Sequence, residues 1–148
     1  MTSEPAASAT QSRTLHPGQA HGPLLVLEAP LSLWGGMDPT TGRITDEHHP
    51  QYGAELAGRV VVLPSGRGSS SSSSVLAEAI RGGTAPAGLL LAEPDPILVL
   101  GALAAAELYG LAVPVVQLDP ASYTSYTRLH DGVWLTVRAE AWTVHLRG

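Results

Sequence analysis

Residues 60–81 combine a strand pattern, a glycine- and serine-rich loop and a helix pattern in one continuous run. Val60 to Leu63 form a short apolar, β-branched segment that ends at Pro64, which is typical of a buried strand. Apolar residues then recur at helical spacing, at Val75, Leu76, Ala79 and Ile80. This run therefore predicts a buried strand, a tight loop and a helix in that order.

The same alternation continues to residue 116. Residues 87–92 predict a second buried strand, and residues 113–116 predict a third, with Pro114 at a sheet edge or at the beginning of its strand. Between them, Asp95 and Pro96 are typical N-cap and N1 residues of a helix that ends near a glycine at position 110. The pattern over 59–116 is β-α-β-α-β, which favours a parallel sheet with right-handed crossovers.

The flanking segments add strands of another kind. Residues 23–28 predict a strand that 31–34 continue after a proline, and 35–53 form a long irregular stretch of Gly, Pro, Asp and Thr. Near the end, 133–137 and 142–146 alternate like antiparallel strands, after a short helical turn over 119–126. We expect an α/β domain over 22–148, with a central β-α-β-α-β unit and extra antiparallel strands, and a disordered tail over 1–21.

Charge and composition exclude several classes of function. Eight basic and thirteen acidic residues give a net charge of −5, so we expect no nucleic-acid partner. The absence of cysteine excludes disulfides, thiolate catalysis and a cysteine-ligated metal cluster held by this chain alone. The apolar stretch 97–116 has the length of a membrane span, but a glutamate, a glycine and a proline interrupt it. We therefore expect no membrane association, and a cytoplasmic protein.

The Gly/Ser loop has two interpretations. Gly66 and Gly68 give the backbone freedom, Arg67 is a forked donor for carboxylate or phosphate, and the serines lie where a helix needs an N-cap. Such a loop at the carboxyl ends of parallel strands predicts an anion site, with unsatisfied N–H groups of the helix directed at it. Six consecutive serines, 69–74, are equally typical of a plain connector.

Three separated motifs, in order, resemble the swivelling domain of the aconitase X family. They are Pro30-Leu-Ser-Leu-Trp-Gly-Gly-Met-Asp-Pro39 with Thr41-Gly-Arg-Ile44, Asp46 and His49-Pro50; Leu63-Pro-Ser-Gly-Arg-Gly-Ser69; and Asp95 to Ala105 with Val113-Pro-Val-Val116. The resemblance covers the chain from about residue 24 to its end. One departure is the unbroken serine run 69–74, where family members often have Cys or Thr after the motif serine.

The resemblance implies a swivelling β/β/α domain that closes over a large catalytic subunit to form a dehydratase. It implies that Ser69 is the proton acceptor, and that an iron–sulfur or iron centre is held by the large subunit and not by this chain. Arg67, Gly68 and Ser70 would contact a small carboxylate substrate. Asp46 and His49 match family positions and are candidate substrate contacts or structural turn residues; a metal site made from the adjacent His48 and His49 alone is disfavoured.

Two substrates are known in the family, cis-3-hydroxy-L-proline and phosphomevalonate. The chain contains no lysine and so lacks the Lys and Glu enrichment that is typical of hyperthermophile proteins. Since many phosphomevalonate enzymes are expected in hyperthermophiles, this composition favours cis-3-hydroxy-L-proline. The alternative outside enzymes is an anion-binding or interaction module that has kept the swivel fold.

Overall fold

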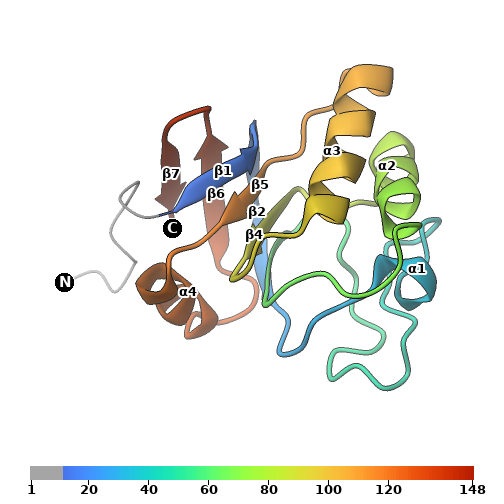
Figure 1. The fold of residues 1–148 in the computed structure, drawn as a ribbon. Coiled ribbons are helices and arrows are strands. Elements are labelled where there is room, and N and C mark those ends of the chain that lie inside the picture. Colours follow the sequence, from blue (N-terminus) through green and yellow to red (C-terminus); the bar gives the residue numbers. More distant parts are fainter. Residues whose placement is uncertain (1–11) are drawn as a thin grey trace.

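The computed structural model describes residues 12–148, which form a single seven-stranded sheet with helices on both faces (Figure 1). The strands are β1 (Arg13–His16), β2 (Gly18–Val26), β3 (Val60–Leu63), β4 (Gly88–Leu91), β5 (Val115–Gln117), β6 (Trp134–Ala139) and β7 (Val144–Arg147). The helices are α1 (Leu33–Gly36), α2 (Ser72–Gly82), α3 (Pro96–Tyr109) and α4 (Pro120–Thr127). Within 12–148, no helix is long and apolar enough to cross a membrane.

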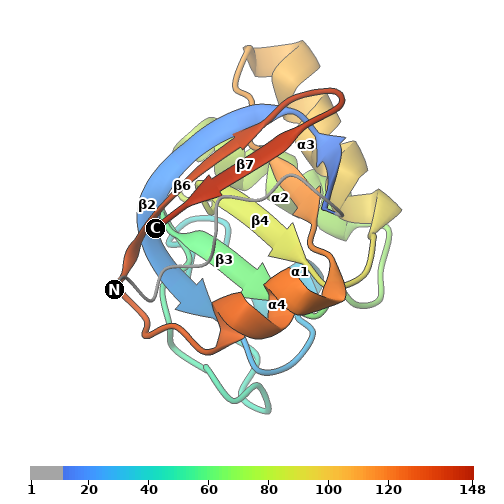
Figure 2. The same cartoon turned by 90° about the vertical axis from the view of Figure 1, so that its left-hand side faces the viewer.

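The predicted β-α-β-α-β unit is confirmed. The strand order is β1-β5-β4-β3-β2-β6-β7, and β2, β3, β4 and β5 are mutually parallel. Every residue of β3 and β4 is buried, because helices α2 and α3 cover one face of these strands while α4 and the β6–β7 hairpin cover the other. Figure 2 shows that the sheet curls, so that the β6–β7 hairpin lies beside the parallel strands. The hairpin, the parallel strands, and helices α2 and α3 on the opposite face therefore form three layers.

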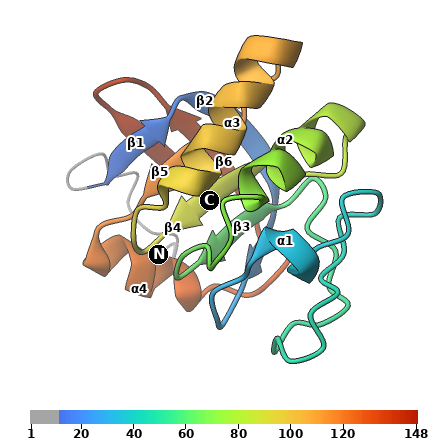
Figure 3. The same cartoon turned by 45° about the vertical axis from the view of Figure 1, so that its right-hand side comes forward.

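Helices α2 and α3 lie side by side on their face of the sheet (Figure 3). Gly101 permits this close approach, since a Cβ at that position would lie 2.7 Å from the carbonyl oxygen of Ser73. As predicted, Asp95 caps α3: its Oδ1 accepts hydrogen bonds from the N–H groups of Ile97 (2.9 Å) and Leu98 (3.3 Å). The carboxyl ends of β3 and β4 therefore meet the N-terminal ends of both helices.

Two sequence predictions are wrong. The predicted tail includes residues 13–21, which instead form β1 and the first part of β2; residues 1–11 lie outside the described part of the chain. This segment is hard to recognise because small residues, Ala20 and Gly22, occupy its buried positions; a Cβ at Gly22 would lie 2.4 Å from the Gly58 carbonyl oxygen. The predicted strand 31–34 is also absent, since only Leu31 makes an isolated bridge, to Gly66, before the short turn α1.

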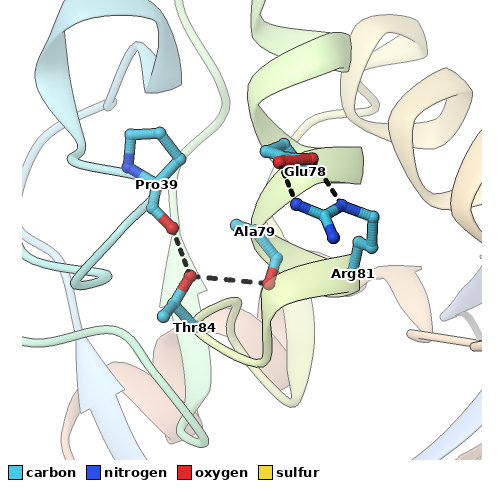
Figure 4. Close-up of polar contacts among 5 residues, drawn as sticks. All are labelled: Pro39, Glu78, Ala79, Arg81 and Thr84. Carbon is cyan, nitrogen blue, oxygen red and sulfur yellow. Dashed lines mark hydrogen bonds and ion pairs between the residues drawn. The ribbon is translucent and has the colours of Figure 1, made fainter.

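The long loop between α1 and β3 is tied to the end of α2. Thr84 Oγ1 donates a 2.6 Å hydrogen bond to the carbonyl oxygen of Pro39 and a longer one to that of Ala79 (Figure 4). Figure 4 also shows the Glu78–Arg81 ion pair, one helical turn away on the exposed face of α2. The bond from Thr84 to Pro39 holds the long loop against the C-terminal end of α2. The N-terminal end of the same helix faces the candidate site.

Candidate functional site

The loop 64–71 leaves the carboxyl end of β3, as predicted, beside the end of β4. The Glu93 N–H donates to the Pro64 carbonyl oxygen (3.0 Å), which holds the beginning of the loop against the chain that follows β4. Gly66 then passes so close to α3 that a Cβ there would lie 2.1 Å from Asp95 Oδ2. Glycine is required here for space, whereas Gly68 has a φ of +85° and is required for its left-handed backbone.

Ser69 closes the loop with two hydrogen bonds. Its Oγ accepts from the N–H of Ser71 (3.0 Å), and its carbonyl oxygen accepts from the N–H of Ser72 (3.0 Å). A backbone N–H directed at a hydroxyl oxygen stabilises negative charge on that oxygen. The half-buried Ser69 side chain is therefore held in one place, and its oxygen is in a setting that favours an alkoxide.

The prediction of free N–H groups at the start of α2 is wrong for the first turn, where the N–H groups of residues 71–73 already have acceptors. The N-cap residue Ser71 makes no side-chain cap bond, and the N–H groups of residues 71–73 donate to Ser69 and Ser70 instead. The serine run bends back on itself and satisfies its own donors. Ser69 Oγ and the exposed Arg67 guanidinium are among the polar groups through which this loop can meet a substrate.

Three of the predicted site residues come together around one small cavity: Arg67, Gly68 and Ser69. The cavity has a volume of about 10 Å³, room for one water molecule. Its remaining lining comes from α3 and its cap (Asp95, Ile97 and Leu98), from Gly66 and Ser72, and from the beginning of α1 and the segment before it (Leu33 and Leu31). The loop, α1 and α3 therefore form one constellation. Ser70 is exposed and does not line the cavity.

Ser72 is a member of this constellation that the sequence analysis does not single out. It is 4% exposed, and its Oγ accepts a 3.0 Å hydrogen bond from the N–H of Trp34, which joins α1 to α2. A signal was present, because Ser72, Leu76 and Ile80 are spaced by four residues and share the buried face of α2. Within a run of six serines, that spacing alone separates Ser72 from its neighbours.

Asp46 and His49 lie in the long loop, and neither lines the cavity. His49 is 6% exposed; its Nδ1 accepts from the N–H of Gln51 (3.0 Å), which leaves Nε2 to donate to the carbonyl oxygen of Ala29 (3.1 Å). Asp46 Oδ1 accepts from the N–H of His48 (2.9 Å) in a tight turn. Both side chains make hydrogen bonds with the backbone that define the shape of the loop.

The described residues were compared with the ligand sets that iron and iron–sulfur centres need. The chain contains no cysteine, and among residues 12–148 no group of three or more His, Asp and Glu side chains could hold a metal ion. The described residues therefore do not fit an iron or iron–sulfur centre.

Comparison with known proteins gives consistent matches over the same region. A family model described as the aconitase X swivel domain matches residues 9–146. The cis-3-hydroxy-L-proline dehydratase of Pseudomonas aeruginosa is 48% identical over 124 residues, which are 81% of this chain and 21% of that protein. The phosphomevalonate dehydratase small subunit of Methanocella arvoryzae is 32% identical over 129 residues, 87% of this chain and 92% of that protein.

A solved structure agrees with these matches. The crystal structure of Thermococcus kodakaraensis aconitase X in its holo-form has a TM-score of 0.79 and 28% identity, covering 98% of this chain and 100% of that one. The chain spans about a fifth of the length of the two cis-3-hydroxy-L-proline dehydratases that it matches, from Pseudomonas aeruginosa and Hypocrea jecorina.

Proposed function

The chain belongs to the aconitase X swivel-domain family, and from that premise we propose that it is the small subunit of a hydro-lyase that dehydrates a hydroxy carboxylate. The observation that supports this most directly is the position of Ser69. Ser69 lines the cavity at the carboxyl ends of the parallel strands together with the exposed Arg67, and its Oγ accepts a backbone N–H.

The reaction has two requirements that these residues meet. A dehydration breaks a C–H bond beside a carboxylate and expels the hydroxyl of the neighbouring carbon as water, so it needs a proton acceptor and a partner for the carboxylate. In our proposal Ser69 Oγ, as an alkoxide stabilised by the Ser71 N–H, takes the proton. Arg67 pairs with the carboxylate, for which its planar guanidinium is suited.

The remaining predicted residues have lesser roles in this proposal. Gly68 lets the loop turn so that Arg67 and Ser69 border the same cavity, and Ser70 is an accessory contact on the exposed side. Asp46 and His49 shape the long loop through their backbone hydrogen bonds and do not touch the substrate. The proposed base is therefore a single residue.

The leaving hydroxyl needs a group that this chain does not supply. Since residues 12–148 contain no fitting set of metal ligands, we assign the iron or iron–sulfur centre to a large catalytic subunit that forms a heterodimer with this chain. Such a centre would polarise the hydroxyl as a Lewis acid. The Methanocella arvoryzae relative is a small subunit, which supports a partner of this kind.

For the substrate we propose cis-3-hydroxy-L-proline. Among the relatives that match more than four-fifths of this chain, the two cis-3-hydroxy-L-proline dehydratases are 44–48% identical and the phosphomevalonate dehydratase small subunits are 32–33% identical. A shorter match, over 53% of this chain, is 51% identical to the phosphomevalonate dehydratase small subunit of Methanopyrus kandleri. The experiment is to co-purify the chain with the aconitase-X-type large subunit from the same genome. Iron content is then measured, and both substrates are assayed side by side.

We expect a one-to-one complex that contains iron and converts cis-3-hydroxy-L-proline. Turnover of phosphomevalonate alone would reassign the substrate but keep the reaction class. An iron-containing complex that converts neither compound, together with an isolated chain that binds phosphate or carboxylates, would instead establish the anion-binding module.

A further inference from the structure

The outer face of helix α3 is apolar although it is exposed. Among its fourteen residues, Glu107 is the single charged one. Large apolar side chains on this helix and just after it are exposed by 41–69%; they are Leu100, Leu103, Leu108, Tyr109 and Leu111, which we call the α3 apolar face. A surface helix normally turns charged and polar residues to solvent, whereas this exposed face carries one charge, Glu107, among large apolar side chains, which indicates an interaction surface.

Leu100, 55% exposed, lies at the centre of this face between two grooves. On one side a groove of about 320 Å³ is lined by Leu15, Val99 and Leu103. On the other side, between α2 and α3, a groove of about 420 Å³ is lined by apolar residues such as Ala77 and Leu108 and by the polar residues Ser73, Ser74 and Glu78. Figure 3 turns these two helices toward the viewer. The side chains of a partner can pack into the two grooves while Leu100 packs between them.

The α3 apolar face is continuous with the candidate site. Asp95 lines both the cavity that contains Ser69 and the groove that contains Leu103. A polypeptide that covers Ser69 is therefore placed to cover the beginning of α3 as well. The face and the site would be buried by the same partner.

The length of the relatives favours a large partner over a second copy of this chain. In the two cis-3-hydroxy-L-proline dehydratases, the matched segment is 21% of the polypeptide, so the same domain there is joined to nearly four times its own length of additional chain. We propose that the α3 apolar face docks the catalytic large subunit, through a mainly aliphatic surface of that subunit with a cation or hydrogen-bond donor opposite Glu107. This inference rests on the proposed function for the identity of the partner.

The test is the affinity of the complex when the face is made acidic. Leu100→Asp with Leu103→Asp should weaken binding of the large subunit by about 30-fold or more, the loss typical of central interface positions. Val133→Asp, an exposed apolar residue (38%) outside the face, is the matched control and should bind like the wild type. Thermal unfolding of each isolated chain checks the fold, and Leu100→Ser replaces the double variant if that variant does not fold.

The affinity for the large subunit, the self-association of the isolated chain and the turnover of the complex are each measured for the wild type and the double variant. Equal affinity of wild type and double variant would overturn the docking site, whether or not the complex is active. Loss of self-association in the double variant, with unchanged affinity for the large subunit, would also overturn it in favour of a second copy. Weakened binding in a complex that dehydrates neither substrate would uphold the docking site and refute the proposed function alone.

Discussion

Replacing Gly66 by alanine should destabilise the protein by about 2 kcal/mol. The new Cβ would lie 2.1 Å from Asp95 Oδ2 and 3.0 Å from Asp95 Cγ, so the carboxylate must rotate away from the loop. That rotation removes the cap bonds to Ile97 and Leu98, a loss of about 1 kcal/mol. Crowding against Leu98, 3.3 Å from the Cβ, adds about 1 kcal/mol more.

Urea unfolding of four proteins tests this reasoning: wild type, Gly66→Ala, Asp95→Ala and the double variant. Asp95→Ala alone should cost about 1 kcal/mol, and it also vacates the space that the new methyl group needs. Gly66→Ala should therefore cost only about 1 kcal/mol in the Asp95→Ala background, from the crowding against Leu98 that remains, which is a coupling of about 1 kcal/mol.

Gly82→Ala is the matched control. Gly82 lies in α2 with nothing within 4 Å of its Cβ position, so alanine should leave stability unchanged or raise it by up to about 1 kcal/mol. Additive effects of Gly66→Ala and Asp95→Ala, or a Gly66→Ala protein as stable as the wild type, would refute the close contact between loop and helix.

Two further predictions concern other polar contacts. Ser72→Ala removes the acceptor for the N–H of Trp34 and should lower the free energy of unfolding by about 1 kcal/mol; a change near zero in urea unfolding would show that α1 is held otherwise. Burial raises the pKa of Asp119, but hydrogen bonds from Ser122, Ser12 and the Ala121 N–H outweigh it and leave that pKa below its ordinary value. A carboxylate with a lowered pKa stabilises the fold above its unfolded pKa of about 3.9 and loses that contribution as the pH falls through the folded pKa. Asp119→Asn should therefore cost about 1 kcal/mol at pH 7 and progressively less below pH ~4, and a pH-independent difference between variant and wild type would contradict this assignment.

The central part of the fold could be predicted because each of its elements has a strong local signal. The buried strands β3 and β4 are continuous apolar runs, and α3 begins at an N-cap pair and ends at a glycine. The N-terminal strands have no such signal. β1 lies at a sheet edge, and the buried positions early in β2 are Gly22 and Ala20, which lie against the distant residues Gly58 and Gly88.

Some features of the candidate site could likewise be predicted from local sequence pattern, and others could not. The position of Ser69 after a strand and before a helix follows from local pattern, as does the exposure of Arg67. The hydrogen bond from the Trp34 N–H to Ser72 and the one from His49 to the Ala29 carbonyl oxygen join residues that are 38 and 20 positions apart in the chain. Contacts between segments far apart in the chain leave no periodic trace in one sequence.

The most direct test of the proposed base is the turnover of the purified complex with Ser69→Ala, against Ser71→Ala as the matched control, which keeps the N–H that Ser69 accepts. We expect Ser69→Ala to lower kcat for cis-3-hydroxy-L-proline by about 10²–10⁴-fold, with the complex and its iron content intact, and Ser71→Ala to remain within a few-fold of the wild type. A Ser69→Ala complex as active as the wild type would contradict the assignment of Ser69 as the proton acceptor.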